Sequence, residues 1–215
     1  MPLTLYHYVH CPFCIRVRLV LGFLNLNYES VVVSYDDEEA PKNLTGKKML
    51  PILACDTGVM NESLEIISFL DSSNKLKYQQ LNGTEDFIKA TELLNLIGES
   101  IHSLAMPYWI WTPEFSEFSR NYFRKIKENK RGPFSNLVKN QSFFLNQLDP
   151  SLKDIEKALS PFYNSPELSL YDIIIASHLW GLYMVPEFQF SEKIHHYLQT
   201  VKHICHFNYH KDFWG

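Results

Sequence analysis

The chain has 215 residues, 46% of them hydrophobic, and its 20 lysines and arginines against 24 aspartates and glutamates give a formal net charge of −4. This length and composition fit a globular protein of one large or two small domains, and they exclude collagen-like and disordered chains. A nucleic-acid-binding protein needs a concentrated basic surface. The acidic balance argues against one, so we expect no nucleic acid partner.

The N-terminus predicts a cytoplasmic protein. Residues 1–6 contain no basic region followed by an apolar run and a cleavage site, so we expect no signal peptide. The longest apolar run, 179–185 with the isoleucines before it, falls short of the roughly 20 residues that span a bilayer. We therefore expect neither a transmembrane helix nor a membrane partner.

Alternating strand and helix patterns fill the first 75 residues. In chain order, the expected elements are a strand at 3–8, a helix at 12–24, a buried strand at 28–33, an acidic loop with one helical turn at 36–46, a hairpin of strands 52–54 and 59–60, and a helix capped by Asn61. This order is too short for a doubly wound sheet. It predicts a compact four-stranded mixed sheet with helices on both faces.

Strand signals disappear after a polar stretch at 72–84. We therefore expect a first domain at 1–75, a linker at 76–85 and an all-helical second domain at 86–215. The helices expected there are 87–104, ended by Pro107, then 115–126, 134–159, a buried helix reaching residue 185, and 191–205.

A strong local signal marks the start of the buried helix. Ser169 stands at the N-cap position and Asp172 three residues later, which is the pattern of a capping box. Leu168 and Ile173 occupy the two positions of a hydrophobic staple. The run that follows is apolar nearly all round, which predicts a central buried helix.

Cys11 and Cys14 are the candidate reactive residues. The sequence Cys11-Pro12-Phe13-Cys14 lies where a predicted strand gives way to a helix. A thiol at a helix N-terminus faces the positive end of the helix dipole and free N–H groups, and both lower its pKa from about 8.5 to roughly 3.5–7.5. Cys11 is therefore the candidate nucleophile and Cys14 the candidate resolving thiol. Cys55 and Cys205 have no such position, and we interpret them as structural.

Two other interpretations of the pair were weighed. A zinc site completed by His7 or His10 is one, although structural zinc usually draws on a second ligand pair and no second C-x-x-C occurs. Two inert core cysteines are the other. A C-x-x-C beside a β-α-β pattern is typical of a thioredoxin-like redox motif, which we prefer, so we expect no metal.

Two later segments fit a ligand with peptide character. Pro51 stands directly before a predicted strand, and a cis bond there would turn the backbone groups of Leu50 outward. Glu62 and Ser63 stand at a predicted helix start, where free N–H groups and a hydroxyl can hold a carboxylate and Glu62 can pair with an ammonium. The simpler interpretations are a loop proline and plain helix capping.

At these residues the chain resembles the glutaredoxin branch of the thioredoxin-fold proteins, in its two-domain form. The site Cys-Pro-Phe-Cys is similar to the dithiol glutaredoxin Cys-Pro-Tyr-Cys. Three segments align in order with the glutaredoxin 2 type, a protein built like a glutathione transferase: residues 11–18, 46–53 and 60–63. The resemblance implies a thioredoxin-like α/β N-terminal domain followed by an all-α C-terminal domain.

The resemblance also implies roles for individual residues. Cys11 is then the nucleophile, Cys14 the resolving cysteine, and glutathione the co-substrate. Its cysteinyl backbone pairs with Leu50 before the cis proline Pro51, its γ-glutamyl end meets Glu62 and Ser63, its glycyl carboxylate meets Lys48, and Phe13 supplies an apolar wall. His10, if protonated, helps to hold the Cys11 thiolate. A two-domain glutaredoxin is expected to be a monomer.

The predicted function is that of a glutathione-dependent thiol–disulfide oxidoreductase acting on glutathionylated or disulfide-containing substrates. One alternative is a cysteine-type glutathione transferase or dehydroascorbate reductase, against which the second cysteine argues. The other is a non-catalytic glutathione-binding, scaffold or iron–sulfur protein, against which Pro12 argues.

Two further groups of side chains were considered. Tyr108, Trp109, Trp111 and Phe115 form an aromatic cluster, for which we prefer packing over a hydrophobic co-substrate wall. A histidine-rich C-terminal stretch offers metal-ligand types, and we prefer an exposed polar end there: His195, His196, His203, Cys205, His206 and His210.

Overall fold

A computed structural model of the chain describes residues 2–209. Its first half holds one four-stranded sheet in the order β2-β1-β3-β4, made of β1 (Thr4–His7), β2 (Glu29–Val32), β3 (Ile52–Cys55) and β4 (Gly58–Met60). β1 and β2 run parallel, whereas β3 is antiparallel to both β1 and β4. The predicted mixed sheet and the hairpin are thus confirmed.

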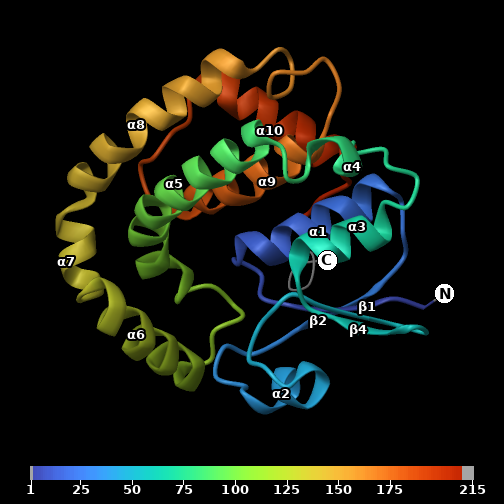
Figure 1. Cartoon of the computed structure of the whole chain (residues 1–215). Helices are drawn as coiled ribbons and strands as arrows, with labels where there is room; N and C mark the ends of the chain where they lie inside the picture. Colours follow the sequence, from blue (N-terminus) through green and yellow to red (C-terminus); the bar gives the residue numbers. More distant parts are fainter. Residues whose placement is uncertain (1, 210–215) are drawn as a thin grey trace.

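Three helices accompany this sheet: α1 (Pro12–Phe23), α2 (Glu39–Thr45) and α3 (Ser63–Leu70). In Figure 1, α1 and α3 lie together on one side of the sheet and α2 lies on the other. Two local expectations were wrong. α3 begins after Glu62 rather than Asn61. Segment 36–46 contains a seven-residue helix, Glu39–Thr45, instead of a single turn, because Asp37 accepts the N–H groups of Glu39 and Ala40 at its start and Gly46 ends it at φ 76°.

The second half is mostly helical, as expected. It contains α4 (Tyr78–Leu81), α5 (Glu85–Trp109), α6 (Glu117–Arg131), α7 (Phe134–Lys139), α8 (Gln141–Ala158), α9 (Leu170–Leu179), a 3-10 helix (Trp180–Met184) and α10 (Glu192–Ile204). Figure 1 shows α5, α9 and α10 packed together, with α6, α7 and α8 forming an arc around them.

Several helix boundaries differ from prediction, and α6, for example, continues to Arg131 instead of ending at residue 126. Pro107 lies inside α5 instead of ending it, because Ala105 and Trp109 around it are buried in the core and hold the last turn in place. Segment 134–159 divides into α7 and α8 at Asn140, whose side-chain amide donates to the carbonyl of Asn136 and so competes with the helical bonds. The central buried helix changes to 3-10 geometry at Trp180.

The predicted start of the central helix is confirmed. Ser169 and Asp172 form the capping box, in which the Asp172 carboxylate accepts the backbone N–H of Ser169 at 2.8 Å. The same carboxylate also accepts the N–H of Tyr163 at 2.9 Å and the hydroxyl of Tyr197 at 3.1 Å. One buried carboxylate thus ties α9 to the preceding loop and to α10.

α1 is buried on two sides. Its residues Val17 and Leu21 pack with Leu5 of β1 in the core above the sheet. Its residues Ile15 and Leu19 belong instead to the large core of the helical half, where α1 lies against α9. The two halves therefore share a core through this helix, while the exact domain limits at residues 75 and 86 stay a prediction. No helix among residues 2–209 is long and apolar enough to cross a membrane.

Gly22 and Gly98 offer a matched test of this packing, since both lie inside helices. A Cβ at Gly22 would stand 1.7 Å from the carbonyl oxygen of Cys205, whereas one at Gly98 would make an ordinary 3.7 Å contact with His178. We expect Gly22→Ala to lower the free energy of unfolding by about 1–3 kcal/mol through overpacking. Gly98→Ala should leave it unchanged or raise it by up to about 1 kcal/mol. Urea denaturation measures both, and equal effects would contradict this account of the α1 interface.

Candidate active site

The fold places Cys11 at the start of α1. Cys11 is the N-cap residue, with an extended backbone at φ −70° and ψ 122°, and its carbonyl accepts the first helical bond from Ile15 at 2.9 Å. Pro12 occupies the first helical position, where the missing N–H costs nothing. The Cys11 side chain is half-buried, and all four cysteines are free thiols.

The two thiols of the pair have opposite acidities. A hydrogen bond from the Cys14 thiol lowers the pKa of Cys11 to about 7 against the opposing effect of burial, helped by the backbone N–H groups of Cys14 and Phe13 and by the charge of Arg16. Burial raises the pKa of Cys14, and the neighbouring Cys11 raises it further. Cys14 is fully buried and its sulfur accepts the N–H of Tyr8 at 3.4 Å. At neutral pH, a large fraction of Cys11 is therefore thiolate, whereas Cys14 remains a thiol.

The nearby positive charge comes from Arg16 rather than from His10. The Arg16 guanidinium lies 4.6 Å from the centre of the Phe13 ring, and burial lowers its pKa only to about 10, so it stays charged at neutral pH. The His10 ring instead contacts Thr112 at 2.8 Å, Tyr209, and the carboxylate of Glu114. His10 thus links the active-site loop to the helical half of the molecule.

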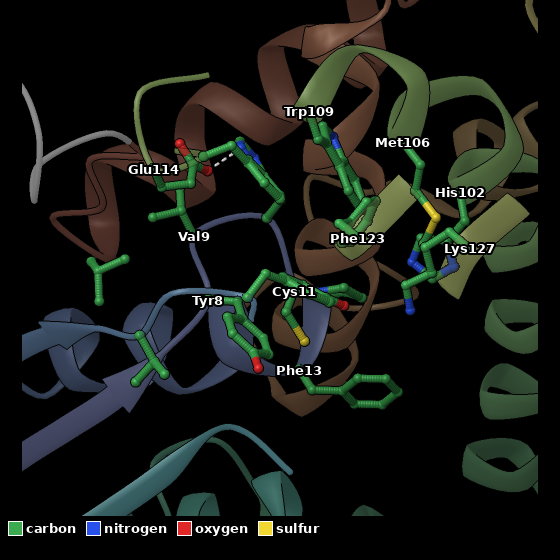
Figure 2. Close-up of a pocket in the computed structure, with 16 residues that line it drawn as sticks. Tyr8, Val9, Cys11, Phe13, His102, Met106, Trp109, Glu114, Phe123 and Lys127 are labelled. Carbon is green, nitrogen blue, oxygen red and sulfur yellow. Dashed lines mark ion pairs between the residues drawn. The ribbon is translucent and has the colours of Figure 1, made fainter. Parts of the chain in front are cut away.

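Cys11 opens into a cavity between the two halves of the molecule. The cavity encloses about 680 Å³ of empty space, part of which is open to solvent. Figure 2 shows Tyr8, Cys11 and Phe13 facing His102, Met106 and Lys127 across it. The wall is largely apolar and aromatic: Tyr8, Val9, Pro12, Phe13, Val32, Val33, Tyr35, Met106, Trp109, Phe115 and Phe123.

The residues expected to bind glutathione lie in two places. Phe13 lines the cavity and is 42% exposed. Leu50 packs in one apolar cluster with Cys14 and Cys11, and the Leu50–Pro51 peptide bond is cis. Leu50 and Pro51 are not part of the cavity wall. Their assigned roles toward glutathione stay predictions.

The other three predicted ligand residues are spread over the start of α3 and the loop before β3. Glu62 is the exposed N-cap residue of α3, and Ser63 is its buried first residue. Lys48 donates a hydrogen bond to the Tyr122 hydroxyl at 2.8 Å and lies 3.6 Å from the Glu38 carboxylate. The structure thus gives Lys48 partners that the sequence did not indicate.

The aromatic cluster divides between two environments. Trp109 and Phe115 are buried and also line the cavity, so they serve both packing and the cavity wall. Trp111 is 68% exposed, under the guanidinium of Arg120.

The C-terminal histidines form no ligand set within the part of the chain that the structure describes, where no group of three or more His, Cys, Asp or Glu could hold a metal ion. His210 lies outside those residues. Cys205 is buried, and burial raises its pKa to about 12.

Sequence reasoning missed the residues that face Cys11 from the helical half. His102 comes from α5 and Lys127 from α6. Burial holds the pKa of His102 down at about 3, with Arg131 and Lys127 adding to the shift, so the ring is neutral. No motif marks either residue, because each stands among ordinary amphipathic helix positions.

Two family models match successive parts of the chain. Residues 5–77 match the family model of the glutathione S-transferase N-terminal domain. Residues 89–211, more than half of the chain, match the family model of the glutaredoxin 2 C-terminal domain. Glutaredoxin 2 of Escherichia coli K12 is 29% identical over 205 residues, which cover 93% of this chain and 94% of that protein.

Solved structures give the same result. Glutaredoxin 2 from Salmonella typhimurium, solved in complex with glutathione, superposes with a TM-score of 0.83 at 28% identity, covering 96% of this chain and 95% of that one. A glutathione transferase from Phanerochaete chrysosporium shares the fold at a TM-score of 0.77 and 20% identity, covering 97% and 98% of the two chains.

The lowered pKa of Cys11 predicts the pH dependence of its alkylation. Thiolate is the reactive form, so the rate with iodoacetamide rises with pH and levels off above the pKa. We expect the half-maximal rate near pH 7, as the pKa of about 7 requires. Mass spectrometry of the peptide carrying Cys11 measures this rate. The Cys11→Ser variant should lack this phase, and a midpoint above pH 8.5 would contradict the assignment.

Proposed function

The chain belongs to the glutaredoxin 2 family, a family of glutathione-dependent oxidoreductases, and from that premise we propose that it is a dithiol glutaredoxin. In this proposal it reduces glutathione mixed disulfides and protein disulfides through Cys11 and Cys14. The observation that carries the proposal is the opposite acidity of these two thiols at the start of α1.

The first step is attack by the Cys11 thiolate on one sulfur of a substrate disulfide. A bond forms between the Cys11 sulfur and that sulfur, the substrate disulfide breaks, and the other half leaves as a thiolate that takes a proton from solvent. The substrate is reduced and Cys11 is oxidised to a mixed disulfide. The lowered pKa of Cys11 supplies the attacking thiolate at neutral pH.

The second step has two routes. In the dithiol route, Cys14 attacks the Cys11 sulfur and closes a disulfide, releasing the remaining thiol. The Cys11 thiolate is one of the groups that keep the pKa of Cys14 high, so forming the mixed disulfide removes that charge and favours ionisation of Cys14. In the one-cysteine route, a glutathione thiolate attacks glutathionylated Cys11, giving glutathione disulfide and restoring the Cys11 thiolate.

We propose that glutathione lies along Leu50, Pro51, Glu62 and Ser63. Leu50 packs beside Cys11, and Ser63 begins α3, whose free N–H groups favour a carboxylate. Phe13 would cover the bound peptide. Lys48 would meet the glycyl carboxylate in exchange for its present neighbour Glu38.

We propose a cytoplasmic monomer, and the chemistry of the thiol pair supports a reducing compartment. A thiol pair that must be returned to its reduced form in each cycle fits a compartment where glutathione keeps thiols reduced. The second cysteine favours disulfide exchange over a transferase reaction, which needs only one.

A coupled assay tests the proposal, with the mixed disulfide of glutathione and 2-mercaptoethanol as substrate. We expect Cys11→Ser to abolish turnover, because the attacking thiolate is gone. Cys14→Ser should keep this activity while losing most of the reduction of a protein disulfide. Cys55→Ser, at a thiol in the β3–β4 hairpin, is the matched control and should behave as wild type.

The outcomes separate the hypotheses. An inactive wild-type protein would refute the glutaredoxin assignment. Equal loss of both activities in Cys14→Ser would show that the roles of the two cysteines are wrongly assigned.

A further inference from the structure

Lys127 carries a positive charge into the cavity without a carboxylate partner. Within the described part of the chain, residues 2–209, no Asp or Glu oxygen lies within ion-pair distance of its ammonium group. The neighbouring cations are engaged, since Arg131 pairs with Glu99 at 2.7 Å and Lys130 reaches the same carboxylate at 3.8 Å. The one acidic residue of the cavity wall, Glu114, contacts His10.

Apart from the Cys11 thiolate across the cavity, the rest of the wall near Lys127 is uncharged and largely aromatic. Its ammonium lies 5.6 Å from the centre of the Tyr35 ring and 5.5 Å from that of Phe123. Tyr35 in turn stacks on Tyr8 at 4.3 Å, and burial raises the pKa of both phenols, so they stay neutral. His102 is neutral as well. The cavity therefore offers aromatic faces and one ammonium group that has no carboxylate partner among residues 2–209.

Burial makes this charge costly. Lys127 is only partly exposed, and burial together with the nearby Arg131 lowers its pKa, while the Cys11 thiolate across the cavity opposes part of that shift. A partly desolvated ammonium without a counter-ion is less favourable than one paired with an anion. A ligand carboxylate in the cavity would supply the missing partner.

The cavity is distinct from the residues proposed above to hold glutathione. Cys11 and Phe13 belong to the cavity wall, but Leu50, Pro51, Glu62 and Ser63 do not. A mixed disulfide bound at Cys11 has two halves. With glutathione along Leu50 and α3, its other half faces the cavity.

We propose that the cavity holds the non-glutathione half of a mixed disulfide, and that Lys127 selects small thiols whose apolar or aromatic body ends in a carboxylate. This inference rests on the proposed glutaredoxin function. Cys11 attacks the glutathione sulfur, the bond between Cys11 and glutathione forms as the disulfide breaks, and the carboxylate-bearing thiolate leaves from the cavity and takes a proton from solvent. A second glutathione thiolate then attacks the glutathione sulfur bound to Cys11, which forms glutathione disulfide and restores the Cys11 thiolate.

Two substrates of nearly the same shape, one with a carboxylate and one with a neutral carboxamide, test the selectivity. They are the mixed disulfides of glutathione with 4-(sulfanylmethyl)benzoate and with 4-(sulfanylmethyl)benzamide. We expect wild-type kcat/KM to be about tenfold higher for the carboxylate, the effect of one charge-assisted contact worth about 1.4 kcal/mol. A ratio near one in the wild type would overturn the proposal without any variant.

Substitutions in α6 then test whether Lys127 causes the preference for the carboxylate substrate. Lys127→Met should bring the carboxylate-to-amide ratio to about one, and Lys127→Arg should keep most of it, because the charge is restored. Lys125→Met is the matched control, since it removes an equal charge from an exposed position of the same helix that does not line the cavity. Loss of the ratio in Lys125→Met, or its retention in Lys127→Met, would refute the role of Lys127.

A binding measurement tests the cavity assignment independently of the proposed function, because it requires no disulfide reduction. Calorimetric titration with 4-methylbenzoate, which has no sulfur, should give a Kd about tenfold lower for wild type than for Lys127→Met. 4-Methylbenzamide should show no such difference. Equal affinities of the two proteins for the benzoate would overturn the cavity assignment. Selective binding in a protein that reduces no disulfide would support the cavity assignment and refute the glutaredoxin function.

Discussion

The burial of α1 on two sides is the constraint on which the rest of the structure depends. One face of α1 packs on the sheet through Val17 and Leu21, and the other enters the core of the helical half through Ile15 and Leu19. A helix held in this way cannot tilt without disturbing both cores. Its N-terminus, and with it Cys11, is therefore fixed at the junction of the two halves.

The same helix separates the two cysteines in acidity. Cys11 precedes the first turn and opens into the cavity, whereas Cys14 is one turn further along and fully buried. Burial raises the pKa of Cys14, and its thiol then donates to Cys11 and helps to lower the pKa of that group. Cys11 and Cys14 are chemically identical residues. Their different positions in the first turn of α1 make one the nucleophile and the other the resolving thiol.

Both halves of the molecule contribute residues to the cavity wall. Tyr8, Cys11 and Phe13 come from the loop after β1 and the start of α1, and the opposite wall comes from α5 and α6. α6 approaches the first half through Tyr122, which contacts Lys48, and through Phe123, which meets Tyr35. These contacts bring Lys127 opposite Cys11 and leave its charge facing an aromatic space.

Local signals in the sequence determined a large part of this protein. The Cys11-Pro12-Phe13-Cys14 motif, the capping box of Ser169 and Asp172 and the hairpin at 52–60 were predictable, because each depends on residues that are close in the chain. Where packing decides, prediction failed, as at Pro107, where a helix continues through a proline because its last turn is buried.

The tertiary structure alone decided what stands opposite the nucleophile. His10 could be expected beside the Cys11 thiolate, yet its ring contacts Glu114, while Arg16 provides the nearby charge. Lys127 is one of several cations on α6 and nothing in its sequence context distinguishes it. The packing of α6 against the first half gives it a place in the cavity, since a contact between segments far apart in the chain leaves no local pattern in either one.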